Sequence, residues 1–316
     1  MKCSVCEERA ISSNPVLCKK HFDEFILKTV EETIERFELF DKKSRIIIGV
    51  SGGKDSLALA DVLLRLGYDV SGLFIDEGIK NYREHSKEDL SFFSGKKNFS
   101  VIKKSFEDEF GFTLDEAIST KKYHACTICG TLRRYLLNKY SRGFDFVATG
   151  HNLDDESQTI LMNLSRSNVD LFLRLGPKSE DSGFFTVRVK PFYFLTEKQI
   201  LTYTLINNIR VEYGECPYAF TSYRANLRNE LNKIEQKKSG SKKNIIETYL
   251  ELKRIMKFKQ KSEEIKNIMI DKKIENINSP LKKTNKCLLC GEASQKPICK
   301  TCVISSKIKN ILKHKD

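Results

Sequence analysis

Ten cysteines are the most distinctive chemical feature of this 316-residue chain, and the CxxC spacing occurs four times among them. No secretory signal precedes the first cysteine, so paired CxxC units predict metal-bound thiolates rather than disulfides. The groups near the two ends each offer four ligands at spacings typical of tetrahedral Zn²⁺. We therefore expect two structural zinc sites, formed by Cys3, Cys6, Cys18 and His21 and by Cys287, Cys290, Cys299 and Cys302.

The middle of the chain has three further cysteines, Cys126, Cys129 and Cys216, with no fourth cysteine close to them. Three thiolates suit a 4Fe–4S cluster in which one iron stays open to bind sulfide. Two alternatives remain. The cysteines could form a persulfide or disulfide relay without iron, or they could bind structural zinc with His124 as the fourth ligand.

A second chemical signal lies in the stretch IIIGVSGGKDSLALADVL, residues 46–63. β-Branched residues run into a double-glycine turn, and a leucine-rich helical pattern follows. Glycines allow a ligand to approach the backbone, and a helix N-terminus attracts anions. The turn is neither a GxxxxGK[ST] loop nor GxGxxG. It predicts a phosphate site made by Ser51, Gly52, Gly53, Lys54, Asp55 and Ser56.

Alternating strands and helices must position these groups. The alternation predicts an α/β protein with a parallel sheet covered by helices on both faces. Ligands of such sheets bind at the carboxyl ends of the strands. From about residue 219 onward the pattern becomes helical. We expect strands at 45–50, 69–76, 98–106 and 145–152, and helices at 22–40, 54–66, 80–97, 130–144 and 154–167.

The positive charge is concentrated in the last quarter of the chain. Residues 1–232 carry 33 basic and 33 acidic side chains, whereas residues 233–316 carry 22 basic and 9 acidic ones. Clustered lysines and arginines bind nucleic-acid phosphates, although a solvated lysine-rich helix has the same composition. No apolar run is long enough to span a membrane. We expect a cytoplasmic protein with no membrane partner.

Two motifs together resemble a known family. SGGKDS and the later GHNLDDE, residues 150–156, are similar to the PP-loop and second phosphate region of N-type ATP pyrophosphatases. Those enzymes split ATP into AMP and pyrophosphate and transfer the adenylate to a carbonyl oxygen. Together with the two terminal cysteine groups and the three middle cysteines, these motifs make the chain resemble tRNA 2-thiouridine synthetases of the TtuA/NcsA type from Cys3 to Cys302.

The resemblance implies a division of the chain into four parts. An N-terminal zinc finger at 1–22 would precede a PP-loop catalytic domain of the adenine nucleotide alpha hydrolase type at 23–218. A basic helical RNA-binding extension would occupy 219–280. A C-terminal zinc finger with a basic tail would occupy 281–316.

The resemblance also implies roles for individual residues. The SGGKDS loop would hold the ATP phosphates, while Phe74 or Ile75 would lie beside the adenine and Asp76 near the ribose or metal. Gly150 and Asp155 would lie at the nucleotide, with Asp155 orienting the reaction or binding Mg²⁺. Arg133 stands where members often have lysine. It keeps the positive charge but excludes proton transfer, because arginine does not deprotonate at working pH.

These roles add up to an ATP-dependent sulfurtransferase that makes 2-thiouridine in tRNA. Its catalytic residues would be Cys126, Cys129, Cys216, Asp155 and Arg133. The resemblance implies a homodimer, with sulfur from free sulfide or from the thiocarboxylate of a ubiquitin-like protein. The sequence does not distinguish a wobble uridine from a T-loop uridine.

Two other functions are compatible with parts of the pattern. Enzymes of cytidine 2-thiolation have a similar PP-loop and a cluster-binding CxxC motif, but they do not usually carry zinc-binding groups at both ends of the chain. A zinc-ribbon RNA-binding protein without catalysis would not need SGGKDS and GHNLDDE intact. Within the second motif, His151 is either a catalytic base or a structural residue.

Overall fold

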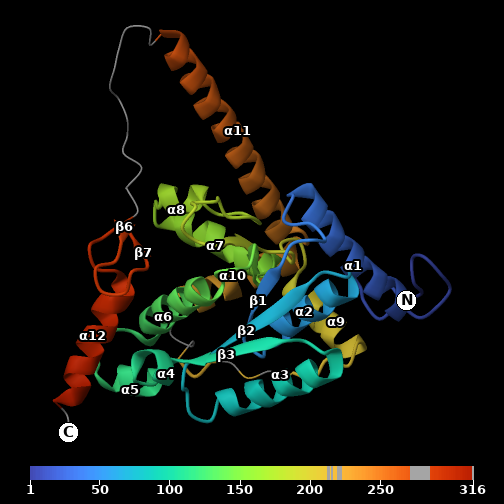
Figure 1. Ribbon diagram of the computed structural model, residues 1–316. Coiled ribbons are helices and arrows are strands. Elements are labelled where there is room, and N and C mark those ends of the chain that lie inside the picture. The colour runs from blue at the N-terminus through green and yellow to red at the C-terminus, as the bar shows by residue number, and fades with distance from the viewer. Residues whose placement is uncertain (212–213, 215, 219–222, 271–284, 315–316) are drawn as a thin grey trace.

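A five-stranded parallel sheet with the order β3-β2-β1-β4-β5 lies at the centre of the molecule (Figure 1). The computed structural model describes residues 1–211, 214, 216–218, 223–270 and 285–314, except for the side chains of 170 and 257–270. The sheet strands are β1 (Ile46–Val50), β2 (Val70–Asp76), β3 (Val101–Ser105), β4 (Phe146–Ala148) and β5 (Val187–Val189). The predicted parallel sheet is confirmed, and β5 is a strand that the sequence pattern did not reveal.

Helices cover both faces of this sheet, as predicted. β1 shows why, because Ile46 and Ile48 enter the core beneath α1, α2 and α9, whereas Ile47 enters a second core beneath α5, α6 and α12. Successive residues of a strand point to opposite faces, so a continuous isoleucine run requires burial on both sides. The helices of the body are α1 (Lys19–Arg36), α2 (Lys54–Arg65), α3 (Arg83–Lys97), α4 (Phe106–Phe110), α5 (Leu114–Ser119), α6 (Ala125–Tyr140), α7 (Leu153–Ser165), α8 (Val169–Leu173) and α9 (Glu197–Ile206).

Helix α6 begins five residues earlier than the sequence pattern predicts. His124 has extended backbone angles and precedes the first turn, which contains Cys126 and Cys129. Ile128 is fully buried and continues the spacing of Leu132 and Leu136, so its packing extends the helix toward the N-terminus. The predicted start of this helix at residue 130 is therefore wrong. Helix α3 differs in the other direction and starts at Arg83 rather than at 80.

The C-terminal part of the chain folds back onto the body. Helices α10 (Tyr223–Lys237) and α11 (Ser241–Ile270) follow the sheet domain, and Tyr249 of α11 packs with Leu153 of α7. After the small hairpin β6 (Asn285–Lys286) and β7 (Ala293–Ser294), α12 (Lys300–Lys313) buries Ile304 and Ile308 in the core of α6. The stretch NSPLKKTNK at 278–286, whose composition predicts a linker, lies mostly outside the described residues.

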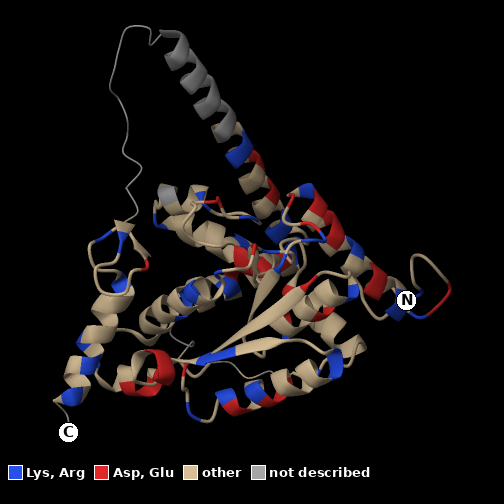
Figure 2. Ribbon diagram, viewed as in Figure 1, with Lys and Arg blue, Asp and Glu red and all other residues tan. Residues whose placement is uncertain are grey.

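Figure 2 shows Lys and Arg along α12 and in the described part of α11. Helix α12 contains four lysines and no acidic residue. The described helices include none with the length and apolarity that a membrane crossing requires.

Candidate active site

The site lies where the strand order reverses. β1 has β2 on one side and β4 on the other, so the loops after β1 and β4 leave the sheet in neighbouring positions. Such a switch point at the carboxyl ends of parallel strands forms a crevice for ligands. A cavity of about 610 Å³ occupies this position, and it is lined by residues from both loops and from α6, α7, β5 and α10.

The SGGKDS loop is held in shape by its own serines. The Ser51 backbone N–H donates to Ser56 Oγ at 3.1 Å, and Ser56 Oγ donates to the Gly53 carbonyl at 2.9 Å. Gly52 has a φ of +79°, and a Cβ there would lie 2.5 Å from the Ser86 carbonyl oxygen. Only glycine fits this turn. The loop therefore delivers the N-terminus of α2 to the cavity without a side chain in between.

Lys54 has a supporting position. Its ammonium forms ion pairs with Asp55 at 2.9 Å and Glu197 at 2.8 Å, and Lys54 is not among the residues that line the cavity. Burial lowers the pKa of Lys54, but the charges of Asp55 and Glu197 raise it by more. Lys54 thus stays charged and fixes the carboxylate of Asp55.

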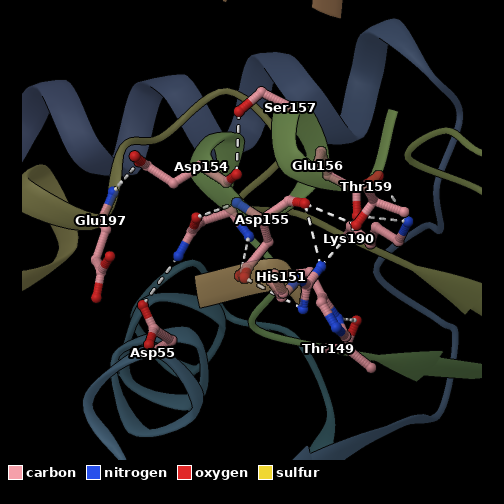
Figure 3. A network of polar contacts seen from close by, with 12 residues as sticks. Asp55, Thr149, His151, Asp154, Asp155, Glu156, Ser157, Thr159, Lys190 and Glu197 are labelled. Carbon is pink, nitrogen blue, oxygen red and sulfur yellow. Dashed lines mark hydrogen bonds and ion pairs between the residues drawn. The ribbon is translucent and has the colours of Figure 1, made fainter. Parts of the chain in front are cut away.

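The GHNLDDE motif brings a second carboxylate to the loop (Figure 3). Asn152 donates through Nδ2 to Asp55 Oδ1 at 3.2 Å and accepts from the Asp155 backbone N–H at 3.1 Å, which caps α7. A Cβ on Gly150 would lie 2.9 Å from the Asp55 carbonyl carbon, so a side chain at 150 would separate the two motifs. Asp55 and Asp155 consequently both line the cavity.

These two carboxylates repel each other. Burial raises the pKa of both, and the charge of Asp155 contributes to the increase at Asp55, against the lowering effect of Lys54. At Asp155, the guanidinium of Arg224 in α10 offsets part of this increase in pKa, because its Nη1 lies 3.9 Å from Asp155 Oδ1. A divalent cation between oxygen ligands of this kind would remove the repulsion. The donor set therefore fits Mg²⁺.

The other polar residues of the motif have partners of their own. Asp154 pairs with the buried Lys242 of α11, and Glu156 pairs with Lys190 at 2.8 Å. His151 Nδ1 lies 2.9 Å from Thr149 Oγ1. The side chain of His151 reaches solvent, but desolvation by the surrounding cavity wall, followed by the charge of Lys190, lowers its pKa to about 4. His151 is therefore neutral near pH 7.

The three middle cysteines come together at one end of α6. Cys126 Sγ lies 3.8 Å from the carbonyl oxygen of Tyr218, and Cys129 and Cys216 pack against the same hydrophobic core. Burial, followed by the charge of Glu77, raises the pKa of Cys129 to about 11. Cys126 is exposed, so the group opens toward solvent on one side.

The terminal cysteine groups are tighter. In each, the four ligand atoms lie within 4.8 Å of one another, whereas the middle three cysteines, all of them described, do not form such a set, with or without His124. The Sγ–Sγ distances are 3.7 Å for Cys6–Cys18 and for Cys290–Cys299. Zn–S bonds of about 2.3 Å in a tetrahedron give an edge of about 3.8 Å. The terminal groups fit one ion each, and the middle group does not.

A buried ion cluster that sequence reasoning missed connects the cysteines to the SGGKDS loop. Glu77 is 0% exposed and pairs with Arg83, which donates to the Ser51 carbonyl at 3.0 Å. The other carboxylate oxygen of Glu77 lies 3.2 Å from Arg133 Nε. Burial lowers the pKa of Arg133, but Glu77 and Cys129, the latter also through a hydrogen bond, raise it by more. The only sequence signal was a carboxylate directly after a buried strand.

The structure separates the predicted nucleotide residues into two sets. Phe74 is buried in the core on the opposite face of the sheet, while Ile75 reaches the cavity. Asp76 forms an ion pair with Lys87 instead. The predicted residues that line the cavity are Ser51, Asp55, Ser56, Ile75, Arg133, Gly150 and Asp155, and those that do not are Gly52, Gly53, Lys54, Phe74 and Asp76.

Comparisons with known proteins give a consistent picture. A family model described as a PP-loop domain matches residues 22–235. A tRNA-5-methyluridine(54) 2-sulfurtransferase of Pyrococcus horikoshii is 36% identical over 281 residues, which cover 85% of this chain and 88% of that protein. Cytoplasmic tRNA 2-thiolation protein 1 of Debaryomyces hansenii is 32% identical, with 96% and 87% covered. The solved U34-tRNA thiolase NcsA from Methanococcus maripaludis, with its [4Fe-4S] cluster, superimposes with a TM-score of 0.72 at 29% identity, with 80% and 88% covered.

Proposed function

Because the chain belongs to the PP-loop family, in the branch that contains the tRNA 2-sulfurtransferases, we propose that it adenylates the C2 oxygen of a tRNA uridine and replaces that oxygen with sulfur. ATP would be converted to AMP and pyrophosphate. The observation that carries this proposal is the single cavity that joins the SGGKDS loop, two carboxylates and Arg133 beside the cysteines.

The chemistry of uridine explains why both halves are needed. C2 lies between two ring nitrogens, so its carbonyl is a poor electrophile and its oxygen a poor leaving group. Adenylation turns that oxygen into part of AMP, which departs once sulfur attacks C2. The enzyme must therefore hold ATP and sulfur on the same side of one cavity.

The SGGKDS loop would bind the ATP phosphates. The N-terminus of α2 favours negative charge, and the hydroxyls of Ser51 and Ser56 lie beside it. Asp55 and Asp155 would hold Mg²⁺, which neutralises charge on the departing pyrophosphate. Ile75 lines the cavity and would offer an apolar contact for the adenine, the role that the resemblance implies for Phe74 or Ile75.

We propose that Cys126, Cys129 and Cys216 hold a 4Fe–4S cluster rather than zinc or a relay. Their sulfur atoms do not converge as a single ion requires, and three thiolates leave one position of a cluster open. A cluster of this kind supplies an iron that can bind and present sulfide. The exposed Cys126 marks the side from which a sulfur donor would arrive, whether sulfide or a ubiquitin-like thiocarboxylate.

Arg133 would orient the adenylate and neutralise its negative charge, and it would not transfer protons. Its guanidinium lies between Glu77 and Cys129 and reaches the cavity. A permanent positive charge at this point stabilises negative charge on the adenylate as sulfur approaches. Arginine cannot act as a base there.

The terminal groups complete the proposal. We propose that each binds a structural Zn²⁺, because the ligand distances fit a closed tetrahedral site. The helices after residue 219 and the C-terminal finger would form an RNA-binding surface around the PP-loop domain at 23–218. Action on tRNA in the cytoplasm agrees with the names of the relatives, and we propose in addition the homodimer that the resemblance implies.

The test is nucleoside mass spectrometry on unmodified tRNA. The iron-reconstituted protein is incubated anaerobically with ATP, Mg²⁺ and sulfide, and in a parallel arm with a ubiquitin-like thiocarboxylate protein. We expect 2-thiouridine, mapped to one loop after digestion, together with AMP. Formation of thiocytidine instead would show that the modified base is cytidine and not uridine. A lack of sulfur on any base in both arms, without tRNA-stimulated AMP formation, would contradict the proposal and favour a binding protein.

A further inference from the structure

Three arginines line one wall of the active-site cavity and form no ion pair with a carboxylate among the described residues. They are Arg134 of α6, Arg174 at the end of α8 and Arg188 of β5. We call these three residues the arginine wall. They come from three separate segments of the chain, so their convergence is a property of the fold.

The wall is held together by contacts between those segments. Arg188 Nη2 donates to Asn138 Oδ1 at 2.6 Å, and Asn138 lies one turn after Arg134 on α6. The Ser179 backbone N–H donates to the Arg188 carbonyl at 2.9 Å, which fixes the segment that follows Arg174 along β5. A Cβ on Gly130 would lie 3.1 Å from Arg134 Nη1, so this glycine leaves room for the guanidinium.

The other cations of the cavity already have anionic neighbours. Arg133 lies against Glu77, Lys190 against Glu156, and Arg224 near Asp155. In the wall the nearby charges include other arginines. Desolvation lowers the pKa of both Arg134 and Arg188. At Arg188 the charge of Arg134 lowers it further, and at Arg134 the charge of Arg133 does so, against the opposing effect of Cys129. Such a site gains stability when a polyanion enters it.

The position of the wall separates it from the ATP phosphates. The phosphates are proposed to lie at the SGGKDS loop, where Ser56 is buried, whereas the side chains of Arg134 and Arg174 are exposed to solvent. A uridine must leave its base stack for its C2 oxygen to reach the bound ATP. Its base then lies inside the cavity, while the phosphates on either side of it stay at the opening. Guanidinium groups bind such phosphates with paired N–H donors.

We propose that the arginine wall binds the backbone phosphates that flank the tRNA nucleotide to be thiolated. This inference rests on the proposed function, since it assumes an RNA substrate that enters the cavity. The arginine wall would position the extruded nucleotide through its phosphates, whichever base that nucleotide carries.

The experiment measures binding of an unmodified tRNA transcript to the holoenzyme as a function of salt. The variants are Arg134→Ala, Arg174→Ala and Arg188→Ala, with Arg134→Lys to preserve the charge. Arg45→Ala is the matched control, because Arg45 is exposed and precedes β1, at the opposite end of the sheet. Binding of a non-hydrolysable ATP analogue is measured in every variant and also reports on folding.

Each lost phosphate contact should reduce the salt slope by about 0.7, so that a rise from about 50 to 200 mM salt weakens wild-type binding about 2.6-fold more per contact than binding by an alanine variant. We expect this change in the three alanine variants, with Arg134→Lys and Arg45→Ala close to wild type and ATP-analogue affinity unchanged. Unchanged slopes in the alanine variants would overturn the inference. A loss of ATP-analogue affinity without a change in slope would overturn it as well and assign the wall to ATP. If the wild type fails to bind tRNA, the proposed function fails with it.

Discussion

Replacement of Glu77 by glutamine should destabilise the protein severely, although the two side chains have the same shape. The carboxylate is fully buried between Arg83 and Arg133, and Arg83 is itself only 7% exposed. The substitution leaves a guanidinium in the interior without its counterion. Removing one partner of a buried pair costs about 3–5 kcal/mol. Arg133 contributes less to this cost, because its side chain is 46% exposed and can turn toward water.

Thermal unfolding of the zinc-loaded protein measures this effect. A loss of about 3–5 kcal/mol in a chain of this size lowers Tm by roughly 5–10 °C. The matched control is Glu197→Gln, which also breaks an ion pair, with Lys54 at 2.8 Å, but at a carboxylate that is 45% exposed. Half-exposed pairs contribute about 0–1 kcal/mol. Its Tm should therefore stay within roughly 2 °C of wild type.

The double variant Glu77→Gln/Arg83→Met separates charge from packing. It removes the uncompensated guanidinium, so it should recover part of the lost stability, whereas simple loss of packing would make it worse. The reasoning fails if Glu77→Gln unfolds at the same temperature as Glu197→Gln.

Three further predictions concern the cysteines, the histidine and the terminal metal sites. Cys216→Ser should abolish tRNA thiolation and leave ATP-analogue binding intact; thiolation in this variant would remove Cys216 from the mechanism. An NMR titration should give His151 a pKa near 4, because desolvation disfavours its charged form. In the unfolded chain this histidine takes up a proton near its ordinary pKa of about 6.5. The contribution of neutral His151 to the stability of the folded protein is therefore complete above that pH and is lost as the pH falls toward 4. A measured pKa near 6.5 in the folded protein would contradict this. Cys290→Ser should halve the zinc content measured by mass spectrometry and lower Tm, because α12 loses its anchor; an unchanged zinc content would rule out metal at that group.

The parts of the structure that depend on neighbouring residues could be predicted from the sequence. Short apolar runs that alternate with helical spacing predicted four of the five sheet strands and their parallel arrangement. The terminal metal groups were equally accessible. Each set of ligands lies within 19 residues of chain, so spacing alone defines it.

The parts that depend on distant contacts could not be predicted. Helix α6 starts at Ala125 because Ile128 packs in the core, and no local signal announces that packing. Glu77 and the arginine wall show the same limit more strongly. The chain has 55 lysines and arginines. Only the fold places Arg134 beside Arg188 or gives Arg133 and Arg83 a shared carboxylate.

The contact between α12 and α6 sets an order of assembly during protein synthesis. Ile304 and Ile308 close the core that includes Ile128 and Leu132, and Arg142 at the end of α6 pairs with Glu292 at 2.6 Å. At translation rates of about 5–20 residues per second, residues 141–316 need roughly 9–35 s to follow α6. During that time the helix that carries Cys126 and Cys129 lacks one of its neighbours. A metal group inserted at these cysteines in the nascent chain would meet an unfinished core, and we expect this site to be filled only after release from the ribosome.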